Sequence, residues 1–245
     1  MSNSATEATS TTASSTSSAS NPAAAQPDGC GNGPVIGSPL PQPSPGKAAG
    51  KVEVVACGAL AGHIREIAAR RGWPVVVRPL PAALHNRPEK IKGHAERELL
   101  TNRAHESRAV IAYADCGTYG ALDDLAETTG AKRLPGLHCY DLYAGAAEIE
   151  QLFSEEPGTY LLTDYLIKSF DKAVIQPLGL DRHPELWTDY FAHYTRLVWL
   201  AQRATTELEE AATRIAARFN LPLTRIDTGT KRLEAALAHV IEPLS

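Results

Sequence analysis

Three of the four cysteines of this chain occupy matching places in the sequence. Cys57, Cys116 and Cys139 each follow an apolar run, in the segments VEVVACGALAG, VIAYADCGTYG and LPGLHCYDLYAG, and a glycine comes directly after Cys57 and Cys116. A thiolate is both a metal ligand and a nucleophile, and thiols stay reduced in the cytoplasm. The pattern therefore favours a metal site, a cluster site or reactive thiols over structural disulfides.

The elements that must position these cysteines can be read from the alternation of apolar runs with segments of helical periodicity after Lys51. Such alternation is typical of right-handed βαβ units, whose strands are covered on both faces. It predicts an α/β fold with a doubly wound, mainly parallel sheet and helices on both faces, a Rossmann-like three-layer sandwich. Strands are expected over 52–56, 74–78, 109–114, 134–138, 159–163, 196–200 and 223–226, and helices over 59–71, 88–105, 120–129, 145–154, 164–172, 184–193, 205–219 and 230–241.

In such a sheet the three cysteines meet at one edge. Ligands bind outside the carboxyl ends of parallel strands, and neighbouring strands lie about 4.8 Å apart. The glycines permit tight turns into the following helices, whose N-termini stabilise a thiolate. Cys57, Cys116 and Cys139 are therefore predicted to bind either a [4Fe-4S] cluster or zinc, with one coordination position left open. The alternative is that small buried cysteines simply pack well in a core.

A second group of polar residues lies in the loop PLPAALHNRPEKI, after the second expected strand. It contains a proton carrier, an amide and a fork-shaped cation, which are the groups expected around a carboxylate or phosphate. His85 and Arg87 are predicted to be catalytic, and Asn86 to bind substrate. The alternative is that Asn86 and Arg87 cap helices and pair with surface acids.

Three further residues are candidates for the same edge of the sheet. Asp115 precedes Cys116 and is predicted as a catalytic group, with helix capping as the alternative. Thr118 follows in the same loop, and Arg182 lies in GLDRHPEL; both are predicted to bind substrate, with a salt bridge, the commoner use of such an arginine, as the alternative for Arg182. His138 points to the face opposite Cys139 in an extended segment, so it is expected to be a hydrogen-bond donor behind the site or a packed histidine rather than a ligand.

Composition limits the classes of partner. Residues 1–50 are almost entirely small and polar, which predicts a disordered tail in which Cys30 has no fixed role, followed by a single α/β domain over 51–245. The net charge of −4 gives no sign of a nucleic-acid partner, and no apolar run is long enough to cross a bilayer. With no basic, apolar signal segment at the start, the expected location is cytoplasmic and the expected partner is a small molecule.

Six motifs together resemble a bacterial and archaeal domain family of unknown function, whose genes often lie near those of corrinoid-dependent methylamine methyltransferases. They are ACGAL, LHNRPEKI, ADCGTYG, LPGLHCYD, EPGTYLLTD and GLDRHPEL, and they span nearly everything after residue 50. Two positions depart from the family pattern, since Tyr119 replaces a glycine and Asp141 stands where glutamate is expected. The resemblance implies a corrinoid or methyltransferase partner and adds weight to the three-cysteine site, without implying a reaction.

Three functions follow. The first is an enzyme, metal- or iron-sulfur-dependent, that acts on a small anionic molecule by lyase, desulfurase or methyl-transfer chemistry. The second is a protein that handles a metal or corrinoid, or regulates a methyltransferase, without turnover. The third is a cofactor-independent enzyme with two cysteines as acid and base, as in aspartate and glutamate racemases, in which a third cysteine has no role.

Overall fold

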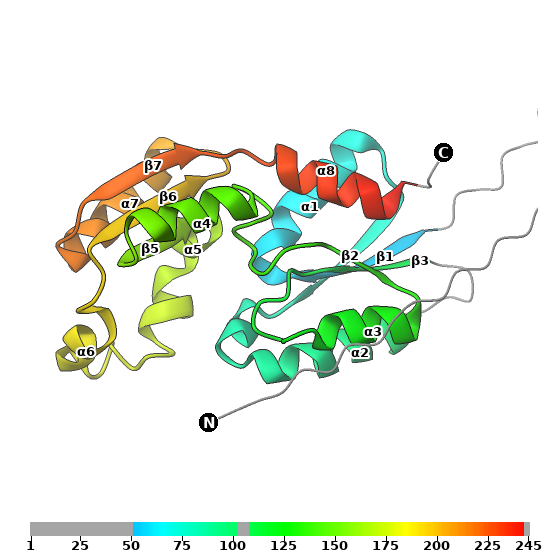
Figure 1. Cartoon of the computed structure of the whole chain (residues 1–245), viewed down its shortest axis with the longest axis horizontal. Coiled ribbons are helices and arrows are strands. Elements are labelled where there is room, and N and C mark those ends of the chain that lie inside the picture. Colours follow the sequence, from blue (N-terminus) through cyan, green and yellow to red (C-terminus); the bar gives the residue numbers. More distant parts are fainter. Residues whose placement is uncertain (1–50, 102–107, 243–245) are drawn as a thin grey trace, which may run out of the picture. The chain divides into compact units, whose positions relative to one another are not determined.

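The computed structural model of the protein describes residues 51–101 and 108–242, which belong to one compact unit, Pro45–Ser245 (Figure 1). The predictions for the tail over 1–50, for Cys30 and for the end of the helix expected to reach residue 105 lie outside the described residues. No helix in the described part of the chain is long and apolar enough to span a membrane.

The first half of this unit is a four-stranded parallel sheet in the order β2-β1-β3-β4. Its strands are β1 (Val52–Cys57), β2 (Val75–Leu80), β3 (Arg108–Ala112) and β4 (Lys132–Arg133). Figure 1 shows helices on both faces, with α1 and α8 on one and α2 and α3 on the other. One apolar core joins this sheet to α1 (Gly58–Arg71), α2 (Ile91–Thr101), α3 (Ala121–Thr129) and α8 (Lys231–Ile241).

A second parallel sheet, in the order β5-β6-β7, follows along the chain. Side chains of its strands alternate between two cores: Leu162 and Trp199 pack with α5 and α7, whereas Leu161 and Leu200 pack with α4. The period of two puts successive side chains on opposite faces, so this sheet is also covered on both sides. Its elements are α4 (Ala146–Glu155), β5 (Thr159–Thr163), α5 (Asp164–Phe170), a π-helix (Asp171–Ile175), α6 (Trp187–Phe191), β6 (Arg196–Ala201), α7 (Thr206–Phe219) and β7 (Leu223–Asp227).

The predicted α/β, doubly wound architecture is confirmed, with two corrections. The strands form two sheets rather than one. The strand expected over 134–138 is also wrong, because pairing with β3 is limited to β4 and the N–H of Leu134, which donates to the Ile111 carbonyl at 3.0 Å. Pro135 then lacks an N–H, and Gly136 turns the chain with a φ of +103°.

The strand order of the first sheet reverses between β1 and β3, since the chain moves from β1 to β2 on one side and then returns to β3 on the other. In doubly wound sheets the crevice outside the carboxyl ends of such a strand pair is where ligands bind. Gly58, at the start of α1, lies in this crevice. A Cβ there would lie 2.7 Å from the carbonyl oxygen of Leu80, so the close approach of α1 to the end of β2 requires glycine.

Candidate metal centre

Each strand of the first sheet delivers one metal-ligating side chain to its carboxyl edge. Cys57 is the last residue of β1, and His85 lies in the 3-10 helix Ala82–Asn86 that follows β2. Cys116 lies four residues beyond the end of β3, and Cys139 six residues beyond β4. We call these four residues the Cys/His cluster. Residues far apart in sequence meet here because parallel strands end at a common edge.

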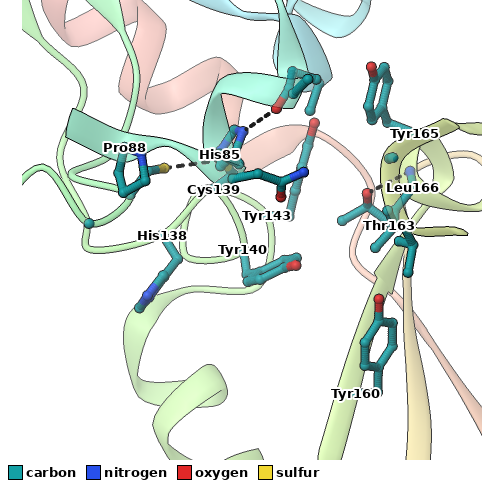
Figure 2. A pocket seen from close by; sticks show the side chains of 18 residues that line it. His85, Pro88, His138, Cys139, Tyr140, Tyr143, Tyr160, Thr163, Tyr165 and Leu166 are labelled. Carbon is teal, nitrogen blue, oxygen red and sulfur yellow. Dashed lines mark hydrogen bonds between the residues drawn. The ribbon is translucent and has the colours of Figure 1, made fainter. Parts of the chain in front are cut away.

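Neighbouring ligating atoms of the cluster lie close together, and Figure 2 shows the contact between His85 and Cys139. The Nε2 atom of His85 is 3.5 Å from the Sγ of Cys139 and 3.9 Å from the Sγ of Cys57. The sulfur of Cys116 is 3.4 Å from that of Cys139, and the ligating atoms of Cys57, His85 and Cys139 all lie within 4.8 Å of one another. Two sulfurs bound tetrahedrally to one zinc ion at about 2.3 Å would be about 3.8 Å apart. The separations within Cys57, His85 and Cys139 therefore have the size expected for ligands of a single ion, and Cys116 adjoins this group through Cys139.

The orientation of His85 is set by its surroundings. Its Nδ1 atom lies 3.0 Å from the carbonyl oxygen of Ala82, and its ring stacks on Tyr113 with centroids 6.0 Å apart. A carbonyl can only accept a hydrogen bond, so Nδ1 carries the proton and donates it. The remaining nitrogen, Nε2, faces the sulfurs. A histidine that binds a metal through one nitrogen commonly donates its other N–H to a backbone carbonyl in this way.

The members of the cluster shift one another's protonation. The contact with Cys139, and next the imidazole of His85, lower the pKa of Cys116 to about 6 against the effect of burial. The same two neighbours hold the pKa of Cys57 well below its usual range. Burial lowers the pKa of His85, but the neighbouring thiolates outweigh it and raise the pKa to about 11. Two ionised sulfurs therefore lie close together in a buried environment. A bound cation would offset their mutual repulsion.

The loop that carries Cys116 is held by Asp115. Its Oδ2 accepts the N–H of Gly117 and of Tyr119, both at 3.1 Å, and its Oδ1 accepts the N–H of Gly120 at 2.8 Å and the hydroxyl of Thr118 at 3.1 Å. Against the effect of burial, these donors lower the pKa of the Asp115 carboxyl. They also offset the cost of two left-handed non-glycine residues, since φ is +50° at position 116 and +53° at position 119.

The loops of Cys116 and Cys139 are tied directly to each other. The N–H of Asp115 donates to the carbonyl of Gly136 at 3.0 Å, and that of Cys116 donates to the carbonyl of Leu137 at 2.8 Å. Asp141 closes the second loop, because its Oδ2 accepts the N–H of Leu137 and of His138 at 2.8 and 3.0 Å. Backbone bonds of this kind leave little freedom in the separation of the two sulfurs.

A cavity of about 530 Å³ opens beside the cluster. Within the described part of the chain, no Lys, Arg, Asp or Glu side chain lines it. Cys57 lies behind the wall, fully buried, while the other three cluster residues line the cavity. Figure 2 shows the rings of Tyr140, Tyr143 and Tyr160 around the same open space. The lining residues are Ala59, Ala82, Ala83, His85, Asn86, Pro88, Cys116, Gly117, His138, Cys139, Tyr140, Tyr143, Tyr160, Thr163, Tyr165, Leu166, Ala173 and Val174.

A known family matches most of the chain that forms this site. It is described as a protein of unknown function, DUF1638, and the match covers residues 79–237. The chain belongs to the DUF1638 family. The matched span contains three members of the cluster and begins after the fourth, Cys57. Neither the curated proteins nor the solved structures include a match to this sequence.

For this DUF1638 protein, the structure brings some of the predicted site residues together and separates others. The three predicted cysteine ligands and His85 form the cluster, and Asn86 lines the cavity. Arg87 and Thr118 do not line it. Asp115 accepts hydrogen bonds from its own loop with both carboxylate oxygens, and it is not a helix N-cap, because α3 follows Gly120 without a side-chain cap. Its predicted catalytic role stays a prediction. Arg182 is largely exposed and lies 3.8 Å from Asp181, away from the cavity lining.

Sequence reasoning missed two polar groups at the site. The Nδ1 of His63 lies 2.8 Å from the hydroxyl of Tyr143, which lines the cavity. Burial lowers the pKa of His63, which favours its neutral imidazole form. The Tyr113 hydroxyl is buried and has no hydrogen-bond partner among the described residues. The position of His63, six residues after Cys57 in the first turns of α1, was the available signal.

Proposed function

We propose that this protein is a metal-dependent enzyme that holds a single ion, zinc by its ligand set, in the Cys/His cluster. The observation that carries the proposal is the convergence of three sulfurs and one imidazole nitrogen, with separations of 3.4, 3.5 and 3.9 Å, from four different strand ends. Cys₃His is a common tetrahedral set for zinc. The hydrogen bond from His85 to the Ala82 carbonyl supports the same assignment.

The short separations favour one ion over an iron-sulfur cluster. Cysteines that bind a [4Fe-4S] cluster ligate different iron atoms, so their sulfurs lie on different sides of a group several ångströms wide. The sulfurs of Cys116 and Cys139 are only 3.4 Å apart. A cluster would require these two cysteines to separate, although their loops are bonded to each other.

The position of the Cys/His cluster beside the cavity supports a catalytic role over metal storage. Three of the four ligands line the cavity, so a bound molecule would lie next to the metal. Zinc in such a site supplies a Lewis acid or activates a bound thiolate, which suits lyase or methyl-transfer chemistry. Cys116 lines the cavity, and its Sγ lies 3.4 Å from that of Cys139 at the edge of the cluster. We assign it the coordination position that a substrate would enter.

The protein supplies a proton carrier on the opposite part of the wall. The Tyr143 hydroxyl and the Nδ1 of His63 share a hydrogen bond of 2.8 Å, and Glu66, further along α1, forms a surface ion pair with Arg203 at 3.0 Å. A proton released or required by a bound molecule can pass between Tyr143 and His63. We assign this pair an acid and base role beside the residues that the sequence suggested.

The test is metal analysis of the full chain after anaerobic purification. We expect one zinc ion per chain, and a Co²⁺-substituted protein with the intense absorption of a tetrahedral thiolate site. Cys57→Ser, His85→Ala, Cys116→Ser and Cys139→Ser should each lower zinc affinity at least a hundredfold, since each removes a direct ligand. His138→Ala is the matched control, because this exposed neighbour of Cys139 is not part of the cluster.

Two results would contradict the proposal. Iron and sulfide in the protein, with a broad band near about 400 nm lost in the cysteine variants, would show a cluster instead. Folded, freshly reduced protein without any metal would leave thiol chemistry of the racemase kind, or plain packing of the cysteines, as the explanation.

A further inference from the structure

We infer that the cavity beside the Cys/His cluster binds a small organic cation, such as a substituted ammonium group, on the faces of its tyrosines. This rests on the proposed function insofar as the bound cation would lie next to the metal centre. The inference replaces the anionic substrate expected from the sequence, because the predicted anion-binding residues Arg87 and Arg182 do not line the cavity.

The lining of the cavity carries the argument. Four tyrosines, Tyr140, Tyr143, Tyr160 and Tyr165, line it beside His85 and His138, and no Lys, Arg, Asp or Glu side chain of the described residues does. The face of an aromatic ring is electronegative and attracts a cation that lies within about 6 Å of its centre. Rings that come from separate elements and surround one space are the arrangement by which proteins recognise ammonium groups that carry alkyl substituents. An anion would meet the same faces without a compensating positive charge.

The hydroxyl groups add to this preference. The side chains of Tyr140 and Tyr160 extend into the open space (Figure 2), and neither hydroxyl forms a hydrogen bond with another of the described residues. Each oxygen is therefore free to accept from an N–H of a bound ammonium group. Tyr160 is held rigidly by its neighbours, because its ring packs against those of Tyr194 and Phe219 with centroids 5.0 and 5.1 Å away. The ring is thus preorganised for a ligand.

A buried negative charge lies close to the cavity, and it would attract a bound cation. Asp164 is 3% exposed and lies between the lining residues Thr163 and Tyr165. Its carboxylate accepts from the indole N–H of Trp199 at 2.9 Å and from two backbone N–H groups, those of Gln202 and Arg203, at 3.2 and 2.7 Å. These donors stabilise a buried negative charge just behind the wall.

The other end of the cavity is also negative. Zinc held by three thiolates and one neutral imidazole carries a net charge of about −1. A cation in the cavity would therefore lie between two anionic groups in a place with few other charges, where electrostatic attraction is stronger than in water. The guanidinium of Arg203 does not cancel this field, since it pairs with Glu66 at 3.0 Å on the surface.

The test compares a cation with its uncharged isostere on the zinc-loaded full chain. Choline and 3,3-dimethylbutanol have the same shape and differ in the charged nitrogen, and 3,3-dimethylbutyrate supplies the anion. Calorimetry or ligand-observed NMR should show choline binding at least tenfold more tightly than the alcohol, with the anion weakest. Equal affinity for choline and the alcohol, or tightest binding of the anion, would overturn the inference.

Variants locate the binding. Tyr140→Leu and Tyr160→Leu should each weaken choline binding roughly tenfold, while Tyr140→Phe and Tyr160→Phe keep most of it because the ring remains. Tyr190→Leu is the matched control, since this tyrosine is 46% exposed on α6 and does not line the cavity. Choline binding that all these variants leave unchanged would place the ligand elsewhere and refute the inference.

Zinc content, measured on the same samples, separates the two proposals. Tyrosine-dependent choline binding by protein that holds no metal would refute the metal centre and support the cation site. Stoichiometric zinc without any preference for choline would refute the cation site alone.

Discussion

Replacing Asp115 by asparagine tests whether this residue positions Cys116 rather than taking part in a reaction. Its carboxylate accepts four hydrogen bonds from the loop that follows it, at 2.8 to 3.1 Å. An amide has one oxygen and one NH₂ group, and the NH₂ group cannot accept from an N–H. In the least costly orientation the amide nitrogen takes the place of Oδ1, because the hydroxyl of Thr118 can turn and accept, whereas the N–H of Gly120 loses its partner.

The expected cost follows from that one lost bond. A hydrogen bond to a charged group contributes about 1.5 to 3 kcal/mol, and the remaining bonds weaken because the acceptor is no longer charged. Since Asp115 is only partly buried, the lower half of this range applies. We therefore expect Asp115→Asn to lower the free energy of unfolding by about 1 to 2 kcal/mol at pH 7. Zinc affinity should fall about 10- to 100-fold, as for other residues that orient a ligand.

The pH dependence gives an independent check. The pKa of Asp115 is lower in the folded protein than in the unfolded chain, where it is about 3.9. The stabilisation is therefore fully present above that value and disappears as the pH falls through the folded pKa. Urea unfolding of reduced, chelator-treated protein between pH 7 and pH 3 should show the wild type losing its advantage over Asp115→Asn.

Asp124→Asn is the matched control, since Asp124 is an exposed acid in the first turn of α3 that caps no loop. It should change the free energy of unfolding by less than about 0.5 kcal/mol. The reasoning is refuted if Asp115→Asn is as stable as this control at pH 7, or if its deficit stays constant down to pH 3.

Four further substitutions test the packing that supports the site. Gly58→Ala should cost about 2 kcal/mol in urea unfolding, because its Cβ would lie 2.7 Å from a backbone oxygen, whereas Gly62→Ala in the same helix meets nothing within 4 Å and should stabilise by about 0.5 to 1 kcal/mol. Tyr119→Gly should stabilise by about 0.5 kcal/mol in the same assay, because this left-handed residue is 95% exposed and loses no packing. Asp164→Ala should cost about 3 kcal/mol in thermal unfolding, since it leaves three N–H donors unpaired, and a loss under 1 kcal/mol would contradict the assigned bonds.

The sequence was informative about the elements because their signals are local. Continuously apolar runs such as Val52–Cys57 and Arg196–Ala201 are strands, and Thr163 and Thr205 cap the helices that they precede. The division into two sheets could not be predicted, because it depends on which strands pair and not on the pattern within any one of them. The short β4 was missed for a local reason, since the apolar residues after it belong to a turn with proline and glycine.

The site was partly predictable for a topological reason. The rule that parallel strands end at one edge was enough to group the three cysteines. The same rule placed His85 at this edge. It could not predict that the His85 ring faces the sulfurs, because this orientation depends on the contacts with the Ala82 carbonyl and the ring of Tyr113. The lack of arginine in the cavity lining could not be foreseen either. Arg87 and Arg182 were expected at the site from their positions in sequence, and the structure places both outside the lining.

The two sheets supply different parts of the site, so substitutions in each sheet should change a different property of it. All four cluster residues follow strands of the first sheet, so the metal depends on β1, β2, β3 and β4. The second sheet adds no ligand; it adds Tyr160, Thr163 and Tyr165, which form the wall opposite the cluster. Substitutions in the second sheet should therefore change which molecule binds while zinc affinity stays the same. Substitutions at the cluster should remove the metal while the aromatic wall remains folded, because Tyr160 packs within a separate core.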